Sequence, residues 1–194
     1  MRSLLITALL ALLLTPAAAH AEDRKVVAER AGCSISVGDR DAAGNDLIVA
    51  DCTWDIPADK VIKAVKAPEK HDEYLSSVEE STRLPDGRVL QVHYASGISN
   101  RQVTLAFTDQ DLPDGGFKTS WTRAPQQEAL RDGLVDVPVN DGYWEVHPNG
   151  AGSKVIYSLR YDAGGKVPTW LVRNFQKGGI SDLVEEMKGV AAKM

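Results

Sequence analysis

Few side chains in this 194-residue chain could carry out chemistry. The two cysteines, Cys33 and Cys52, have neither the spacing of a redox C-x-x-C pair nor that of a zinc knuckle. His71, His93 and His147 lack the H-E-x-x-H or H-x-H spacing of a metal site. No G-x-S-x-G elbow, dinucleotide-binding glycine motif or P-loop occurs. These patterns predict no catalytic residue, no metal site and no cofactor.

The first 21 residues have the three parts of a secretory signal. Arg2 supplies a positive charge, Leu4–Leu14 is an apolar run, and Ala19-His20-Ala21 offers small residues before a cleavage site. The apolar run is too short to span a bilayer, which takes ~20 residues. We therefore predict a signal peptide over residues 1–21, one mature domain over residues 22–194, and a periplasmic or secreted protein.

Export changes the interpretation of the cysteines, because paired cysteines in an oxidising compartment usually form a disulfide. Residues 33–37 alternate, residues 47–54 read as a second strand, and the segment between them is rich in Gly, Asp and Asn. A register that places Val37 opposite Ile48 also places Cys33 opposite Cys52. The pattern predicts a disulfide across this hairpin.

Composition excludes several partners and classes of protein. Lys and Arg number 22 against 27 Asp and Glu, so the net charge of −5 argues against nucleic acid, whose binding needs a basic surface. The hydrophobic content of 43% is that of an ordinary globular domain.

Periodicity then predicts a mixed fold. A helix is expected over residues 58–66 and a shorter one over residues 69–74. Period-two strands are expected over residues 76–84, 89–96, 101–108, 117–123 and 135–139, with a long loop over residues 124–134. This is the pattern of a half-buried antiparallel sheet.

The last predicted hairpin, Tyr143–His147 with Ser153–Tyr161, has an apolar face and a polar face. Pairing Val146 with Val155 also pairs Trp144 with Tyr157 and collects the large apolar side chains on one face. His147 falls on the opposite, solvent-exposed face.

A long amphipathic helix over residues 168–188 is predicted to cover the apolar face. Gly178 and Gly179 interrupt it at a cost of roughly 1 kcal/mol each relative to alanine. Close packing of the helix on the sheet, or a hinge or cavity wall, would explain them.

In this order of elements the sequence resembles the START lipid-transfer domains. The motifs that carry the resemblance are Trp144-Glu-Val-His-Pro148, Ser153–Tyr157 and Gly164-Gly-Lys-Val-Pro-Thr-Trp-Leu171 running on to Asn174 and Phe175, with Asp55–Asp59 and Asn100-Arg101 further upstream. The resemblance implies an α+β helix-grip fold, in which a curved antiparallel sheet wraps around the C-terminal helix and encloses an apolar cavity.

The resemblance also implies one hydrophobic ligand or lipid, bound between helix and sheet by a monomer that makes transient membrane contact. The residues expected to surround it are Val103, Leu105, Phe107, Phe117, Trp121, Trp144, Tyr157, Leu159, Leu171, Phe175, Leu183 and Met187. The helix or the loop over residues 124–134 is expected to open the cavity. Cholesterol-binding members carry a buried basic and acidic pair, whereas here the strand over residues 103–107 has no charge beyond Arg101. Fatty acids, phospholipids, isoprenoid quinones and hopanoid-like lipids remain candidates.

Two alternatives remain open. The first is an enzyme that resembles polyketide cyclases and dehydratases on the same fold, which a convergent Arg/His/Asp cluster inside the cavity would favour. The second is an envelope interaction module without a ligand, which a cavity of several hundred Å³ would exclude.

Overall fold

The computed structural model describes residues 24–94, 96–167, 171 and 175–194. The predicted signal sequence over residues 1–21 and most of the first half of the predicted C-terminal helix lie outside these residues. No helix in the described part of the chain is long and apolar enough to cross a membrane.

A ten-stranded sheet forms the body of the protein, with the strand order β1-β2-β3-β10-β9-β7-β6-β5-β4. The neighbours along this order are antiparallel, and β8 pairs in parallel with β6. The strands are β1 Lys25–Arg30, β2 Cys33–Arg40, β3 Asp46–Trp54, β4 Val78–Arg83, β5 Val89–His93, β6 Arg101–Asp111, β7 Phe117–Arg123, β8 Val135–Asp136, β9 Val139–Asn149 and β10 Gly152–Asp162.

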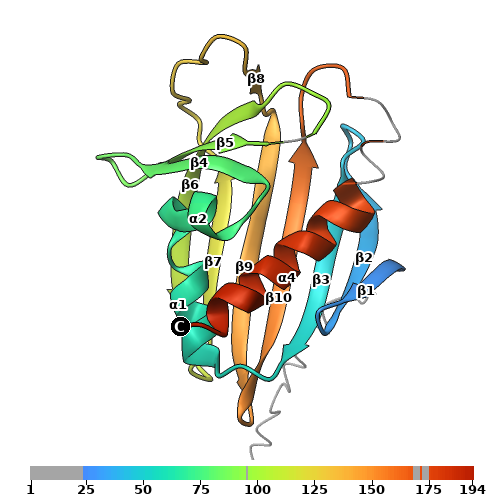
Figure 1. Cartoon of the computed structure of the whole chain (residues 1–194), viewed down its shortest axis with the longest axis vertical. Helices are drawn as coiled ribbons and strands as arrows, with labels where there is room; N and C mark the ends of the chain where they lie inside the picture. The colour runs from blue at the N-terminus through green and yellow to red at the C-terminus, as the bar shows by residue number, and fades with distance from the viewer. Residues whose placement is uncertain (1–23, 95, 168–170, 172–174) are drawn as a thin grey trace, which may run out of the picture.

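The helices lie on one face of this sheet. The C-terminal helix α4, Ile180–Ala191, runs diagonally across it, and α1 and α2 lie toward one end (Figure 1). The helical segments are α1 Ala58–Val65, η1 Pro68–Lys70, α2 His71–Tyr74, a π-helical turn η2 at Phe175–Gly179, and α4. This confirms the predicted α+β helix-grip architecture.

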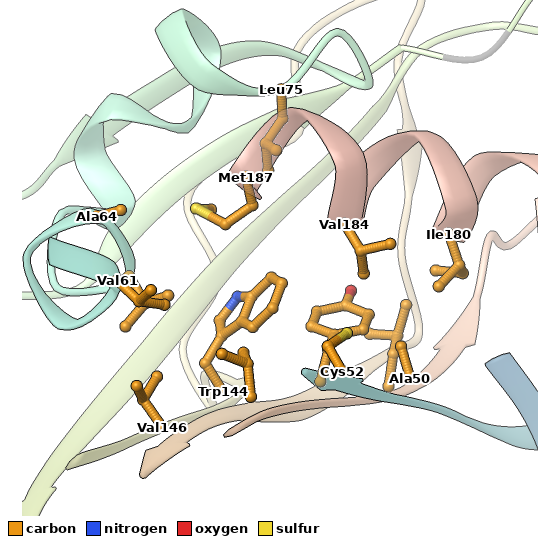
Figure 2. Packing of buried hydrophobic residues seen from close by; sticks show 14 of the residues in the cluster. Ala50, Cys52, Val61, Ala64, Leu75, Trp144, Val146, Ile180, Val184 and Met187 are labelled. Carbon is orange, nitrogen blue, oxygen red and sulfur yellow. The ribbon is translucent and has the colours of Figure 1, made fainter. Parts of the chain in front are cut away.

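The core lies between α4 and the sheet. Ile180, Val184 and Met187 project from one side of α4 toward the strands, each with no exposed surface (Figure 2). Met187 meets the end of the core that is closed by Val61 of α1 and Trp144 of β9. Side chains from α1 and α4 therefore fill one end of the space between α4 and the sheet.

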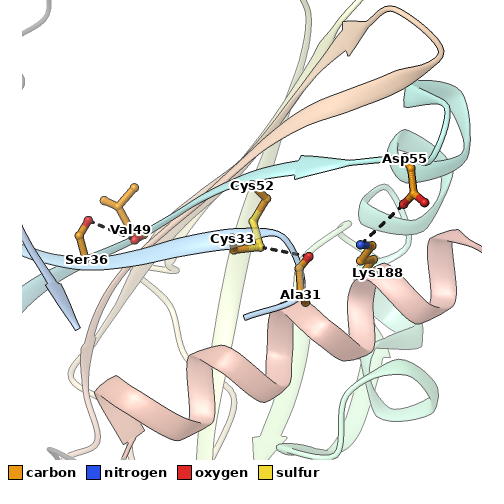
Figure 3. Close-up of a disulfide and its surroundings, with 7 residues drawn as sticks. All are labelled: Ala31, Cys33, Ser36, Val49, Cys52, Asp55 and Lys188. Carbon is orange, nitrogen blue, oxygen red and sulfur yellow. Dashed lines mark hydrogen bonds and ion pairs between the residues drawn. A yellow bond between two sulfur atoms is a disulfide. The ribbon is translucent and has the colours of Figure 1, made fainter. Parts of the chain in front are cut away.

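The hairpin of β2 and β3 has the predicted register. Val37 pairs with Ile48, Ile35 with Ala50, and Cys33 with Cys52. The two cysteines form a disulfide between Cα atoms 3.9 Å apart (Figure 3). The alternation and the turn composition were sufficient to predict this pairing.

We expect titration of the unfolded protein without reductant to find no free thiol. Removing the cross-link in a Cys33→Ala/Cys52→Ala variant should lower the free energy of unfolding by roughly 3 kcal/mol, because the loop is no longer closed in the unfolded chain. Chemical denaturation measures this change. Two free thiols in the oxidised protein would contradict the assignment.

Strand β1 is absent from the sequence-based prediction. Its sequence, KVVAER, does not alternate, and four of its six residues are exposed because it lies at an edge of the sheet. A strand that buries little side-chain area leaves little periodicity in the sequence. Its position follows from backbone pairing with β2.

The loop over residues 124–134 is confirmed as a segment without regular structure, and its side chains bond to β6. Gln127 accepts a hydrogen bond from the Thr104 backbone N–H at 2.7 Å and donates one to the Thr104 carbonyl at 2.9 Å. Only Ala124 of this loop is fully buried, and none of its residues lines the cavity described below. The loop is attached to β6 and lies outside the cavity wall, and its part in opening the cavity stays a prediction.

Candidate functional site

A cavity of about 510 Å³ lies between α4 and the sheet. Its walls come from α2, η2, α4, β4–β7, β9 and β10, and most of the lining side chains are apolar or aromatic. Its volume falls within the range of about 300–1,000 Å³ typical of small-molecule pockets. The space between α4 and the sheet is therefore packed at one end and hollow over the rest.

Nine of the twelve predicted ligand-binding residues line this cavity. They are Leu105, Phe107, Trp121, Trp144, Tyr157, Leu159, Leu171, Phe175 and Leu183. Their contact with a ligand stays a prediction.

The other three predicted residues, Val103, Phe117 and Met187, are buried but do not line the cavity. Phe117 lies near α1, where the Lys66 ammonium sits 4.0 Å from the centre of its ring. Met187 also packs against the end of the core closed by α1 (Figure 2). Periodicity identified the covered face, but α1 fills one end of that face.

Aromatic rings form a continuous wall across the concave side of the sheet. Trp144 and Tyr157 have ring centres 4.5 Å apart, Trp121 and Tyr157 5.9 Å, and Phe107 and Trp121 6.0 Å. The Trp121 indole N–H donates to the side-chain carbonyl of Asn140 at 2.9 Å. Because the polar group of this indole is satisfied, its ring presents an apolar surface to the cavity.

A polar network that we did not predict crosses one end of the cavity. Its side chains are His71 of α2, Ser81 of β4, Gln91 and His93 of β5, and Tyr161 of β10. Ser81 accepts a hydrogen bond from Gln91 and donates one to the Pro68 carbonyl of η1. Gln91 Nε2 lies 3.1 Å from His71 Nδ1, Gln91 Oε1 lies 3.1 Å from His93 Nε2, and His93 Nδ1 lies 3.0 Å from the Tyr161 hydroxyl.

The central amide assigns the protons in this network. An amide nitrogen only donates and a carbonyl oxygen only accepts, so His71 Nδ1 accepts from Gln91 and His93 Nε2 donates to it. A neutral His93 then accepts the Tyr161 O–H at Nδ1. A neutral His71 carries its proton on Nε2, which is buried and has no hydrogen-bond partner among the described residues.

Burial keeps the three titratable members of the network uncharged. It lowers the pKa of both His71 and His93 from 6.5 to about 4, with Glu69 opposing the shift at His71 and the nearby His71 adding to it at His93. Burial also raises the pKa of the Tyr161 hydroxyl above its usual range. None of these groups has a pKa near 7, where a general acid or base is most effective.

Sequence reasoning missed this network because its members come from separate elements. The one available signal was that Val89, Gln91 and His93 alternate, which places two polar side chains on the inward face of β5. The position of His71 beside them depends on how α2 packs against the sheet.

The paired glycines lie in the π-helical turn that precedes α4. Gly179 lines the cavity, and a Cβ there would approach the Phe175 ring to 2.9 Å. A Cβ on Gly178 would meet nothing within 4 Å. Gly179 is thus part of the cavity wall, whereas Gly178 is exposed, and neither glycine is required by close packing on the sheet.

His147 lies on the surface face of β9, as predicted. Its ring nitrogens are 2.6 Å from Asp114 and 2.8 Å from Glu145, and these two carboxylates raise the pKa of the imidazole. In the part of the chain that the structure describes, no cluster of three or more His, Cys, Asp or Glu side chains is arranged to hold a metal ion.

Sequence comparison gives limited information. No protein-family model matches the chain. An uncharacterized protein of Pseudomonas aeruginosa is 26% identical over 97 residues. The alignment covers 50% of this chain and 48% of that relative.

Structural comparison is far more informative. A STAR-related lipid transfer protein fragment from Xanthomonas axonopodis superposes with a TM-score of 0.78 at 20% identity, covering 87% of this chain and 98% of that one. Human StAR-related lipid transfer protein 5 gives 0.82 at 13% identity over 90% and 89% of the two chains. An aromatase/cyclase from Streptomyces gives a lower TM-score of 0.56 at 12% identity over 76% and 93%. At these identities the comparisons establish the fold.

Proposed function

We propose that this chain, whose fold is that of the START lipid-transfer domains, is an exported carrier that holds one hydrophobic ligand between α4 and the concave face of the sheet. The observation that carries the proposal is the 510 Å³ cavity at that place, with its wall of aromatic and aliphatic side chains. Apolar ligand surface buried there is stabilised by about 25 cal/mol per Å². The periplasmic or secreted location is part of the proposal and rests on the N-terminal sequence.

Membrane contact would let a monomer exchange its ligand. Tyr94 lines the cavity yet is 53% exposed, which makes it one of three exposed large hydrophobic side chains among the described residues. An aromatic ring with a polar tip at a cavity entrance suits the interface between water and lipid. We therefore propose that any contact with a membrane is made through this side of the protein.

The second candidate is an enzyme of the cyclase type. His71, His93 and Arg101 all line the cavity, and this cluster is the feature that favours the enzyme. Against it stand the pKa values of about 4 for both histidines, which make them weak bases at neutral pH. The electrostatics of the cavity therefore favour binding over proton transfer.

Native mass spectrometry of the protein purified from its own envelope is expected to show one bound hydrophobic molecule per chain. After extraction of that molecule, the protein should take up one equivalent from vesicles and gain thermal stability, since a ligand that binds only the folded state raises its stability. A molecule that is released chemically altered would support the enzyme. Failure of the extracted protein to take up any lipid would overturn the carrier.

A further inference from the structure

We propose that the polar end of the cavity, formed by Arg101, His93 and Tyr161, binds the negatively charged head of an amphipathic ligand. The ligand class is a long apolar chain that ends in an oxygen acid, either a carboxylate or a phosphate monoester. This inference rests on the proposed function and specifies the class of ligand for the same cavity.

The first step is that Arg101 is a buried charge with no acidic partner among the residues that the structure describes. It lines the cavity and is only 4% exposed. Burial lowers the pKa of its guanidinium, and the nearby Tyr161 opposes this shift. No carboxylate of the described residues contributes to it. Among the residues that the structure does not describe (1–23, 95, 168–170 and 172–174), the acidic ones are Glu22 and Asp23, at the predicted start of the mature chain.

The groups that Arg101 does contact are neutral. Its Nε donates to the Ala163 carbonyl at 3.3 Å, and Nη1 donates to the Ser99 carbonyl. Among the described residues, Nη2 has no hydrogen-bond partner. Two backbone carbonyls orient the guanidinium but do not neutralise it, and a buried charge normally has an opposite charge beside it.

The neighbouring side chains cannot provide that charge. His93 is directly opposite Arg101 in the pairing of β5 with β6, and it holds the Tyr161 hydroxyl at 3.0 Å. Both side chains are neutral, because burial lowers the pKa of the imidazole to about 4 and raises that of the phenol. A guanidinium, in contrast, stays protonated at neutral pH.

The remaining formal charges in the cavity lining have other partners. Asp182 and Glu186 project from α4. Asp182 lies 3.6 Å from Arg30, and Glu186 accepts the Ser76 backbone N–H at 3.1 Å. The missing negative charge at Arg101 is therefore supplied by a ligand. A carboxylate or phosphate suits the planar edge of a guanidinium, and the aromatic wall suits the apolar chain.

The test compares four ligands with the same straight sixteen-carbon scaffold: palmitate, hexadecyl phosphate, hexadecanol and methyl palmitate. Binding to the lipid-extracted protein is measured by isothermal titration at neutral pH, below the concentration at which each ligand aggregates. We expect one or both anionic ligands to bind at least about tenfold more tightly than the alcohol and the ester, the typical gain from a charged hydrogen bond. Which anion binds more tightly distinguishes a fatty acid from a phosphorylated lipid.

Two substitutions at Arg101 and one matched control assign the effect to this residue. Arg101→Gln should reduce the preference for the anions to within about threefold and leave hexadecanol binding intact, whereas Arg101→Lys, which keeps the charge, should retain part of the preference. The control is Arg160→Gln. Arg160 also donates to two backbone carbonyls, those of Asp39 at 3.0 Å and Asn45 at 2.8 Å, but it does not line the cavity. The Arg160→Gln variant should bind all four ligands with the affinities of the unmodified protein.

Each outcome decides between the two proposals. Equal binding of all four ligands by the unmodified protein overturns the anionic head and leaves the carrier function standing. A preference that survives in Arg101→Gln, or is lost equally in Arg160→Gln, overturns the role of Arg101. If none of the four binds, the carrier function fails as well. Hexadecanol binding by Arg101→Gln shows that this variant is folded, and Arg101→Lys provides the test if it is not.

Discussion

Lowering the pH from 7 to 4 is expected to destabilise this protein by on the order of 6 kcal/mol through two buried histidines. Burial holds the pKa of His71 and His93 at about 4, against 6.5 for an ordinary histidine. As the pH falls below 6.5, the unfolded chain binds protons that the folded protein does not, so stability decreases with acidity. The loss is roughly 3 kcal/mol per histidine at pH 4, a large part of the stability of a typical domain.

The groups around the two imidazoles explain why their pKa values are lowered and not raised. His71 faces the Gln91 amide and the carboxylate of Glu69, and His93 faces Gln91, Tyr161 and Arg101. Only Glu69 favours the protonated form, and desolvation outweighs it. Protonation of His93 Nδ1 would also remove the acceptor for the Tyr161 hydroxyl.

Urea denaturation between pH 7 and pH 4.5 measures the effect, and the double variant His71→Asn/His93→Gln should flatten the curve over this range. His147→Gln is the control, because Asp114 and Glu145 raise the pKa of His147 and its protonation stabilises the folded state. Proton NMR of the folded protein should show two imidazoles that remain neutral at pH 5.5 and a third that is protonated there. A wild-type stability curve that is level across this range would contradict the prediction.

Adding volume at two adjacent residues of α4 should have opposite consequences. Leu183 lines the cavity, whereas Val184 has no exposed surface and belongs to the packed core (Figure 2). Leu183→Trp can project its extra atoms into the cavity, so it should abolish most ligand uptake with little change in the thermal midpoint. Val184→Trp should cost roughly 1 to 3 kcal/mol through overpacking and leave binding by the folded fraction intact.

Both properties are measured in the same samples, by thermal unfolding and by partitioning of a fluorescent fatty acid analogue. Leu171→Trp or a bulky change at Phe175 should behave like Leu183→Trp, because both residues also line the cavity. If Leu183→Trp lowers the midpoint as far as Val184→Trp and binds the analogue normally, the lining residues are ordinary core. The ligand site would then lie elsewhere, although the fold would be unchanged.

The pairing of neighbouring strands could be predicted from the amino-acid sequence alone. A side chain in a strand changes face at every residue, so one turn and one apolar face fix the register of a hairpin. This is why the Cys33–Cys52 pairing and the pairing of Trp144 with Tyr157 were predicted and are found. The helix-grip architecture followed from the order of the elements and from the START-like motifs near the C-terminus.

Which of the covered residues face the cavity depends on the packing of the whole fold. Trp144 and Phe117 are equally buried, but Trp144 lines the cavity and Phe117 lies near α1. On α4, Leu183 is partly buried and lines the cavity, whereas Met187 has no exposed surface and packs in the filled end of the core. Periodicity reports whether a side chain is removed from water and cannot report whether its neighbour is a side chain or a void.

The polar end of the cavity could not be predicted from the sequence either. His71, His93, Arg101 and Tyr161 come from α2, β5, β6 and β10. Curvature of the sheet brings β10 back to within hydrogen-bond distance of β5, although the strand order separates them. Local patterns encode contacts along one strand or hairpin, whereas this site depends on how far the whole sheet bends around α4.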